Sequence, residues 1–248
     1  MHGSRSPGPA GRRPRRPQSR LAKGVRMSDQ QPPACDDSQL CQELAGHRDG
    51  IAFHEIYMGD PDSRVVLESA NFALVADISP LAPGHTLLVP KDHYISFGQI
   101  PGCLYAELDE FREKCISLIA QKYEPPTILE HGSCSSMMNS PCISHAHWQI
   151  IPNCQSAVQI FEADGLAGRD IISWRGLKEP GDNDLPYLYY SNGNVHRLYV
   201  EKLSKRHQYI RVVLAEVLGI PEPEWDWGLS LRPDLLRQTV RGLSGTGR

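Results

Sequence analysis

The chain has 248 residues, with 26 basic and 29 acidic side chains, and 40% of its residues are hydrophobic. That length fits one ordinary domain or two small ones, and the hydrophobic content excludes wholesale disorder. The sequence holds no run of about 18 apolar residues, which excludes a transmembrane helix and a membrane partner. Seven cysteines are too few for a disulfide scaffold, so we expect a cytoplasmic protein with reduced thiols.

The charge of the chain is unevenly distributed. The first 26 residues hold seven arginines, one lysine and no acidic residue, and they are rich in Pro, Gly and Ser. Such a segment cannot bury enough apolar surface to offset its ordering entropy, so residues 1–37 are predicted to be a disordered basic and Pro-rich leader and linker. A basic tail can bind nucleic acid by counterion release, but the acidic remainder speaks against nucleic acid as a partner. Met27, where the composition changes, is a candidate start of the natural chain.

Helix and strand patterns begin at residue 38. Residues 38–46 predict a short helix with a capping serine at its start and a glycine at its end. Residues 63–68 and 72–77 predict two strands of a hairpin. Residues 86–90 are apolar on both faces, which predicts a central strand.

The longest predicted helix covers residues 103–122, because Leu, Phe, Cys and Ile recur there at three- and four-residue steps. Residues 127–130 and 145–151 predict two further strands, and residues 154–194 read as irregular. Strands in hairpins with a few helices favour an α+β fold with an antiparallel sheet. Two C-terminal helices are predicted over residues 204–218 and 233–243.

The most informative segment is HAHWQIIP at residues 145–152. Side chains of a strand alternate between faces, so His145, His147 and Gln149 are expected to share one face. Two imidazoles and an amide in a row could bind a metal through the histidines, or surround a phosphate that one imidazole attacks. A polar strand face without chemistry is the third interpretation. The low frequency of His weakens that interpretation, and Gln, a poor transition-metal ligand, weakens the metal interpretation.

HAHWQIIP resembles the signature strand of the histidine triad (HIT) superfamily, in which His alternates with hydrophobic residues. The block VADISPLAPGHTLLVPKDH at residues 75–93 is similar to a second motif of the family, and Glu130-His131-Gly132 is a weaker third match. Together the matches span residues 38–152 in the family's order. The His-x-His-x-Gln form resembles the branch of galactose-1-phosphate uridylyltransferase and the dinucleoside-polyphosphate phosphorylases, whereas hydrolase branches carry His at the third position.

The resemblance implies a HIT-like antiparallel sheet with a long helix in a nucleotide-binding catalytic domain, residues 38–155. A partly helical C-terminal extension would follow over residues 156–248. The implied activity is that of a nucleotide hydrolase or nucleotidyl transferase that attacks the α-phosphate of a nucleotide conjugate through a nucleotidyl-histidine intermediate. A dinucleoside polyphosphate or a nucleotide sugar is the expected type of substrate. The alternative is a catalytically weak HIT-like nucleotide-binding or interaction protein, which Gln149 and the unmatched C-terminal third favour.

The resemblance also assigns three catalytic residues. His147 is the expected nucleophile, and it must be neutral at the attacking nitrogen. His145 is expected to orient the strand network and contact the phosphate side. Gln149 can donate to a phosphate oxygen but cannot act as an acid, which favours transfer to an acceptor over hydrolysis.

Four residues are assigned to nucleotide binding by the same resemblance. Asp77 is expected to bind the ribose, since a carboxylate suits the two O–H donors of a cis-diol. Ile78 is expected to pack on the base. Asn139 and Ser140, in the loop before the signature strand, are expected to reach the phosphate or the leaving group.

A structural zinc ion occurs in some members of the family, held by a Cys-x-x-Cys pair and later histidines. Here Ser38 stands in place of the first Cys, and Cys41 and His93 are what remains of the set. Because a complete tetrahedral set is not visible, neither a metal nor a cofactor is expected. Dimers are usual in the family, so a homodimer is expected.

Overall fold

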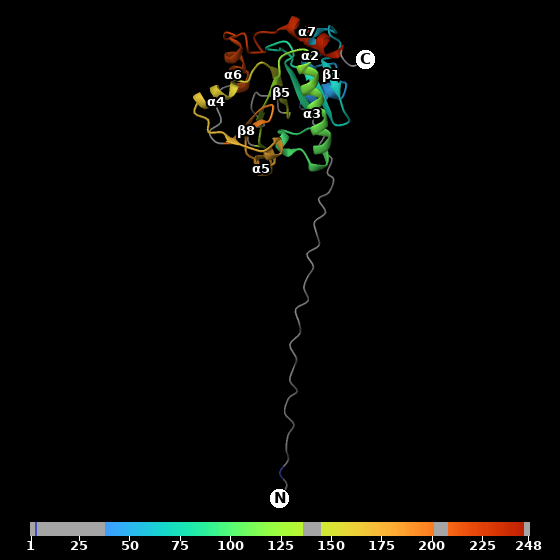
Figure 1. The fold of residues 1–248 in the computed structure, drawn as a ribbon. Helices are drawn as coiled ribbons and strands as arrows, with labels where there is room; N and C mark the ends of the chain where they lie inside the picture. Colours follow the sequence, from blue (N-terminus) through green and yellow to red (C-terminus); the bar gives the residue numbers. More distant parts are fainter. Residues whose placement is uncertain (1–2, 4–37, 136–144, 201–207, 246–248) are drawn as a thin grey trace. The chain divides into compact units, whose positions relative to one another are not determined.

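The structure is a computed structural model that describes residues 38–135, 145–200 and 208–245, together with Gly3 (Figure 1). The leader and linker predicted at residues 1–37 otherwise lie outside the described residues. Among the described helices, none combines the length and the apolar character that a membrane span requires.

One antiparallel sheet of eight strands forms the centre of the fold, with the order β1-β2-β3-β5-β4-β7-β8-β6. The predicted α+β class with an antiparallel sheet is confirmed. The strands are β1 (Val65–Glu68), β2 (Phe72–Ala76), β3 (Thr86–Pro90), β4 (Pro126–Gly132), β5 (Trp148–Pro152), β6 (Arg169–Asp170), β7 (Tyr187–Asn192) and β8 (Val195–Tyr199).

Seven α-helices are described around this sheet. The long helix α3 lies within the predicted range, and α7 begins at the predicted residue with Pro in its first turn, where the missing N–H is no loss. The helices are α1 (Gln39–Leu44), α2 (Ala52–Tyr57), α3 (Tyr105–Ala120), α4 (Ala157–Ala163), α5 (Lys178–Asp182), α6 (Tyr209–Leu218) and α7 (Pro233–Ser244).

Local signals explain the N-terminal elements. The side-chain oxygen of Ser38 accepts a hydrogen bond from the amide of Cys41, so α1 is capped as the sequence predicts. The amide of Ser69 donates to the carbonyl of Phe72 at 2.9 Å, which closes the predicted hairpin between β1 and β2. The strand β3 has the predicted bounds and is buried along its whole length.

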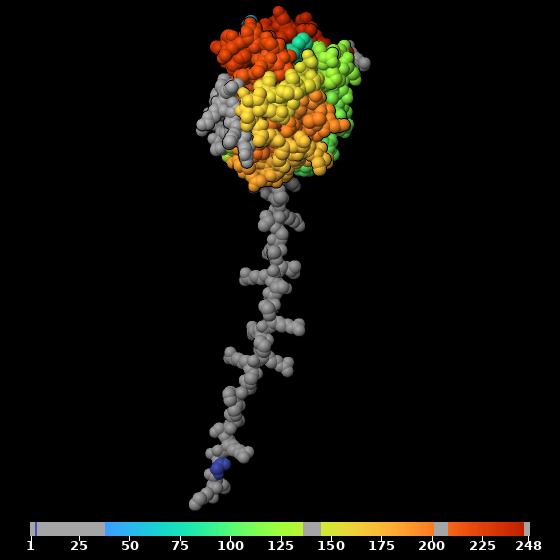
Figure 2. All heavy atoms as spheres, turned by 60° about the vertical axis from the view of Figure 1, so that its left-hand side comes forward, coloured from blue at the N-terminus to red at the C-terminus, as the bar shows by residue number. Residues whose placement is uncertain are grey.

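The two faces of the sheet carry different layers. On one face α3 packs on the largest core cluster, which contains Phe72, Leu88 and Trp148. On the other face α1 covers one end of the sheet through Leu40, whereas α4 and α6 cover the other end. Figure 2 shows the α4 residues (yellow) against the orange-red residues of the α6 region. The second face therefore has two separate apolar clusters, with strand β5 between them.

The C-terminal part departs from the sequence prediction. The prediction of irregular structure over residues 154–194 is wrong, because α4, β6, α5 and β7 lie there. Strand β7 pairs with β4 from Ile128↔Ser191 to Gly132↔Tyr187. The C-terminal extension, predicted as partly helical, thus contributes three strands to the same sheet. The sheet has no break at residue 155, where the boundary of the domain was predicted.

The signature strand is shorter at its start than predicted. Strand β5 begins at Trp148 and ends at Pro152, whereas the prediction began it at His145. The two histidines of the signature therefore precede the strand, where their backbone carbonyls and side chains make contacts other than ladder hydrogen bonds.

Candidate active site

Gln149 marks the centre of the candidate site on the second face of the sheet. In the strand register it is paired with Leu87 of β3 and with Leu129 of β4. Those two leucines belong to the two different apolar clusters of that face. Gln149 is buried, and its Oε1 has no hydrogen-bond partner among the described residues. A buried amide oxygen without a partner costs free energy in the absence of a ligand or water, which is typical of a binding site.

His147 is held in one tautomer by the backbone. Its Nδ1 lies 2.8 Å from the carbonyl oxygen of His145, and because a carbonyl only accepts, Nδ1 must carry the proton. The lone pair is then on Nε2. Burial lowers the pKa of His147 below its ordinary value, against the opposing effects of the His145 carbonyl and of Asp77. His147 is therefore a neutral imidazole with one nitrogen ready to attack or to accept a proton.

His145 supports the site through its backbone. Its Nε2 donates to the carbonyl of Pro90 at 2.7 Å, which leaves Nδ1 unprotonated and 3.1 Å from Cys41 Sγ. Burial lowers the pKa of His145 to about 4, so the ring is neutral at pH 7. Because both ring nitrogens of His145 are engaged, His145 contributes to the site through its backbone carbonyl, which accepts the hydrogen bond from His147 Nδ1.

Three side chains near His145 could hold a metal ion. Cys41 Sγ lies 3.3 Å from His93 Nδ1 and 3.1 Å from His145 Nδ1, and the three ligand atoms lie within 4.8 Å of one another. These spacings and donors suit a zinc ion with bonds of about 2.3 Å to sulfur and about 2.0 Å to nitrogen. The hydrogen bond from His145 Nε2 to a carbonyl is the usual support of a metal-binding imidazole. The fold thus assembles a three-ligand set, although Ser38 stands in the fourth position of the family pattern.

A zinc titration tests this set. Ser38→Cys is expected to raise the zinc affinity about tenfold or more, because a second thiolate, as the fourth ligand, completes a tetrahedral site, although loss of the serine cap costs about 1 kcal/mol. Cys41→Ala is expected to abolish zinc binding, and Cys103→Ala, at an exposed cysteine, is the matched control. The measurement is competition with a chromophoric chelator. Equal affinity of Ser38→Cys and wild type would contradict the assignment.

Two further histidines flank the reaction centre. His131 lies in strand β4, two residues beyond Leu129, which pairs with Gln149. Burial, and then the charge of His147, lower the pKa of His131 to about 4, and its Nε2 has no partner among the described residues. The Nδ1 of His85 accepts the amide of Leu81 at 3.2 Å, so the ring proton lies on Nε2, which also has no partner among the described residues. Both histidines are therefore candidates for contact with a ligand.

Asp77 lies on the same side of the site and is buried. Its Oδ1 accepts the amide of Ser79 at 2.8 Å and Nη1 of Arg211 at 3.0 Å. Burial alone would raise the pKa of Asp77, but Arg211, His85 and the Ser79 amide outweigh it, and the pKa is lowered to about 2. The carboxylate is therefore ionised and oriented, as a group that accepts two hydroxyl donors must be.

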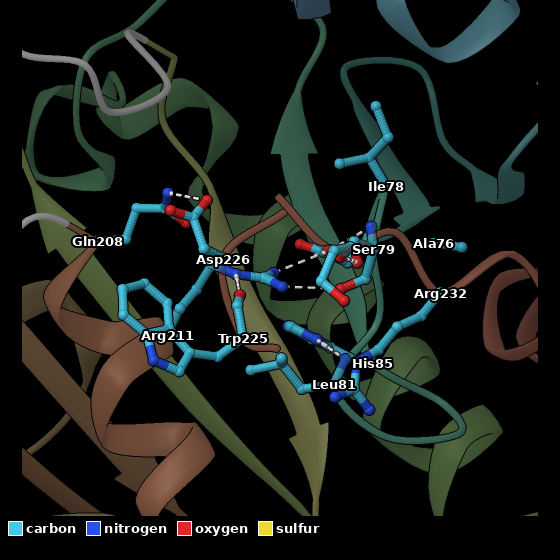
Figure 3. Close-up of polar contacts among 12 residues, drawn as sticks. Ala76, Ile78, Ser79, Leu81, His85, Gln208, Arg211, Trp225, Asp226 and Arg232 are labelled. Atoms are coloured by element: carbon cyan, nitrogen blue, oxygen red, sulfur yellow. Dashed lines mark hydrogen bonds and ion pairs between the residues drawn. The ribbon is translucent and has the colours of Figure 1, made fainter. Parts of the chain in front are cut away.

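Of the other residues predicted to bind nucleotide, Ile78 alone is among the described residues. Ile78 packs with the cluster of Phe53 and Tyr57, and in Figure 3 its side chain points away from the contact between Arg211 and Ser79. Asn139 and Ser140 lie outside the described residues. The predicted roles of these three residues stay predictions.

Arg211 is a further residue of the site that the sequence analysis missed. It belongs to α6, in a part of the chain without a recognised motif. The signal that could have found it is its position between Ile210 and Val212 in an apolar helical stretch. A buried arginine needs a charged partner, so such a position indicates an ion pair.

Comparison with known proteins agrees with this geometry. Residues 50–151 match the family model described as "Scavenger mRNA decapping enzyme C-term binding". An uncharacterized HIT-like protein of Methanocaldococcus jannaschii is 26% identical over 114 residues, which are 46% of this chain and 81% of that protein. Residues 50–151 are thus similar to proteins of the histidine triad superfamily. The resemblance predicted from the HAHWQIIP and VADISPLAPGHTLLVPKDH motifs is confirmed at this level.

Solved structures of HIT proteins are also similar to part of the chain. A Streptococcus mutans protein covers 53% of this chain and 78% of its own, with a TM-score of 0.37 and 22% identity. A HIT family member from Bacillus subtilis covers 47% of this chain and 73% of its own, with a TM-score of 0.36 and 21% identity. The branch within the HIT superfamily, the homodimer and the cytoplasmic location stay predictions.

Proposed function

We propose that this HIT protein is a nucleotide hydrolase or nucleotidyl transferase that attacks the α-phosphate of a nucleotide conjugate through His147. The observation that carries the proposal is the hydrogen bond from His147 Nδ1 to the His145 carbonyl, which directs the lone pair to Nε2. Two further polar atoms of the site, Oε1 of Gln149 and Nε2 of His131, are buried and have no hydrogen-bond partner among the described residues. An aspartate suited to a ribose lies on the same side of the site.

The chemistry needs two displacement steps. In the first, the Nε2 lone pair of His147 forms a bond to the α-phosphorus, and the bond from phosphorus to the leaving-group oxygen breaks. The leaving group departs with that electron pair and takes a proton from solvent, because Gln149 cannot supply one. In the second step an oxygen of water or of an acceptor attacks the phosphorus, the N–P bond breaks, and His147 returns to its neutral form.

The proposed experiment looks for the intermediate and the products together. The protein is incubated with α-labelled dinucleoside polyphosphates, nucleotide sugars and a cap-like dinucleotide, the last because the matched family model is that of a scavenger decapping enzyme. Each substrate is supplied with and without phosphate as acceptor, and products are identified by mass. An acid-labile nucleotidyl adduct mapped to His147 supports the proposal. Turnover with an adduct on another residue, or binding without turnover, contradicts it; the second result would favour the catalytically weak binding protein.

The pH dependence of the rate follows from the shifted pKa of His147. The attacking form is the neutral ring, which exists above the pKa, and burial lowers that pKa from its ordinary value of 6.5. The rate is therefore expected to stay constant as the pH is lowered from 8 through 6.5. It should decrease only at a lower pH, where His147 becomes protonated. Initial rates at saturating substrate between pH 4 and 8 provide the measurement. A rate that already halves at pH 6.5 or above would contradict a buried neutral nucleophile.

Gln149→His is expected to raise the ratio of hydrolysis to transfer by about tenfold or more. An imidazole at this position can exchange protons with the leaving group or with water, whereas the carboxamide forms hydrogen bonds but does not exchange protons. The ratio is measured from the products formed in a fixed excess of phosphate. Gln149→Asn, which keeps an amide, is the control and should leave the ratio low. An unchanged ratio in Gln149→His would remove the mechanistic role of Gln149.

A further inference from the structure

The contact between Asp77 and Arg211 joins the HIT domain to the C-terminal segment. Arg211 of α6 makes three hydrogen bonds, with Nε to the carbonyl of Trp225 at 3.0 Å, Nη1 to Asp77 Oδ1 at 3.0 Å and Nη2 to the carbonyl of Ser79 at 2.8 Å (Figure 3). The side chains of Arg211 and Asp77 are each only 7% exposed. A guanidinium bonded in three directions cannot rotate, so it fixes the oxygen that it binds.

The segment that supplies the Trp225 carbonyl is itself tied down. Gln208, at the start of α6, donates to Asp226 Oδ1 at 3.1 Å, and the same oxygen accepts the amide of Gly228 at 2.9 Å. Arg211 is thus held from its own helix and from the turn that follows it.

The free energy of folding does not by itself explain why Asp77 and Arg211 are buried together. Removing two charges from water costs about as much as their attraction returns, so such pairs are often neutral for folding and are retained for geometry. Both contacts to Asp77, from Ser79 and from Arg211, use Oδ1. They orient the carboxylate while Oδ2 stays outside these contacts.

We propose that Arg211 is a positioning residue of the ribose subsite, so that the C-terminal segment makes this HIT protein select ribonucleotides over deoxyribonucleotides. The inference rests on the proposed function, since it needs a nucleotide at the site. An oriented buried carboxylate accepts both hydroxyls of a ribose, and a deoxyribose leaves one acceptor position unsatisfied. A site built for a hydroxyl rejects the analogue that lacks it. Arg211 lies outside the residues 50–151 that match the family model, so the selection would be a property added by this chain.

The test compares ribose and deoxyribose binding in matched variants. Dissociation constants are measured by calorimetry for AMP, GMP, CMP and UMP and for their 2′-deoxy and 3′-deoxy forms. Wild type is expected to bind the best ribonucleotide about tenfold or more tightly than its deoxy forms. Arg211→Met is expected to reduce that ratio to about one by weakening the ribonucleotide alone, as is Asp77→Asn. The control is Arg112→Met, which removes a buried arginine of the opposite face and should keep the wild-type ratio.

Each outcome decides the inference. If Arg211→Met keeps the wild-type ratio, Arg211 is purely structural. If that variant binds the ribonucleotide more tightly than wild type, Arg211 competes with the ribose for Asp77. Either result overturns the inference. Nucleotide binding by wild type without a ribose preference overturns it while the proposed function stands, and no nucleotide binding by wild type overturns both. If circular dichroism shows that Arg211→Met is unfolded, Arg211→Lys carries the test. Lysine keeps the charge but not the fork of three bonds, so its ratio is expected to fall between those of wild type and Asp77→Asn.

Discussion

Replacement of His147 by alanine is expected to lower turnover of the nucleotide conjugate at least about a thousandfold and to abolish the covalent adduct. The physical reason is that the His145 carbonyl fixes the tautomer of His147 and leaves its Nε2 unprotonated as the attacking atom. Binding should survive, because the proposed contacts of the substrate to Asp77 and Gln149 remain. Turnover is measured as kcat and binding as the dissociation constant of the product nucleotide.

The matched control for this variant is His196→Ala. His196 is a half-buried histidine whose Nδ1 lies 2.7 Å from the hydroxyl of Tyr189, on strand β8 and away from the signature segment. It should keep wild-type turnover. Addition of free imidazole should partly restore turnover to His147→Gly, because the missing group then enters from solvent. Full activity of His147→Ala would assign the reaction to a different nucleophile.

Replacement of Glu130 by alanine is expected to lower the free energy of unfolding by about 3 to 5 kcal/mol. This buried carboxylate accepts the amide of Phe97 at 2.7 Å, the indole N–H of Trp148 at 3.0 Å and the hydroxyl of Tyr187 at 2.8 Å. The three donors come from a short 3₁₀ helix (Phe97–Gln99), β5 and β7, so one side chain joins the two halves of the sheet. Without Glu130, all three donors are left buried and unpaired. Urea unfolding at pH 7 provides the measurement.

Glu107→Ala is the matched control for this effect. Glu107 also accepts three hydrogen bonds, from Ser69 and from the amide and side chain of Asn71, but it is only half-buried. Water can replace it there, so a loss of about 1 kcal/mol is expected. Equal losses in the two variants would show that burial of the donors does not decide the effect.

The stability contributed by Glu130 should also depend on pH. Burial raises the pKa of Glu130 from 4.5 to about 7 in the folded protein. A raised pKa means that the folded state binds the proton more tightly than the unfolded state. The part of the stability that depends on this proton is therefore full below about pH 4.5 and is lost as the pH rises through 7, whereas the three hydrogen bonds that Glu130 accepts remain. Glu130→Gln, which cannot titrate, should lack this dependence.

Much of the fold could be predicted because its signals are local. The cap of α1, the hairpin of β1 and β2 and the apolar run of β3 each depend on a few adjacent residues. Strand β7 was missed because Gly and Asp clusters surround it. The tyrosines of YLYYSN and the following Gly-Asn turn into β8 were nevertheless typical hairpin signals.

The candidate site could be predicted only where its residues are neighbours in sequence. His147 and Gln149 lie two residues apart, so alternation alone places them together. Asp77 and Arg211 are 134 residues apart, and no periodicity reports on such a contact. The approach of Cys41 to His145, 104 residues apart, depends on how α1 packs on the sheet and was likewise not visible in the spacing.

The pairing of β4 with β7 has a consequence for anyone who shortens this protein. A chain cut after the last family motif would leave the N–H and C=O groups along one whole side of Pro126–Gly132 without their partner strand. An unpaired strand edge of this kind pairs with strands of other chains and causes aggregation. Expression trials should therefore keep the chain through Tyr199, because a fragment that omits β7 and β8 would report on aggregated material instead of on the folded protein.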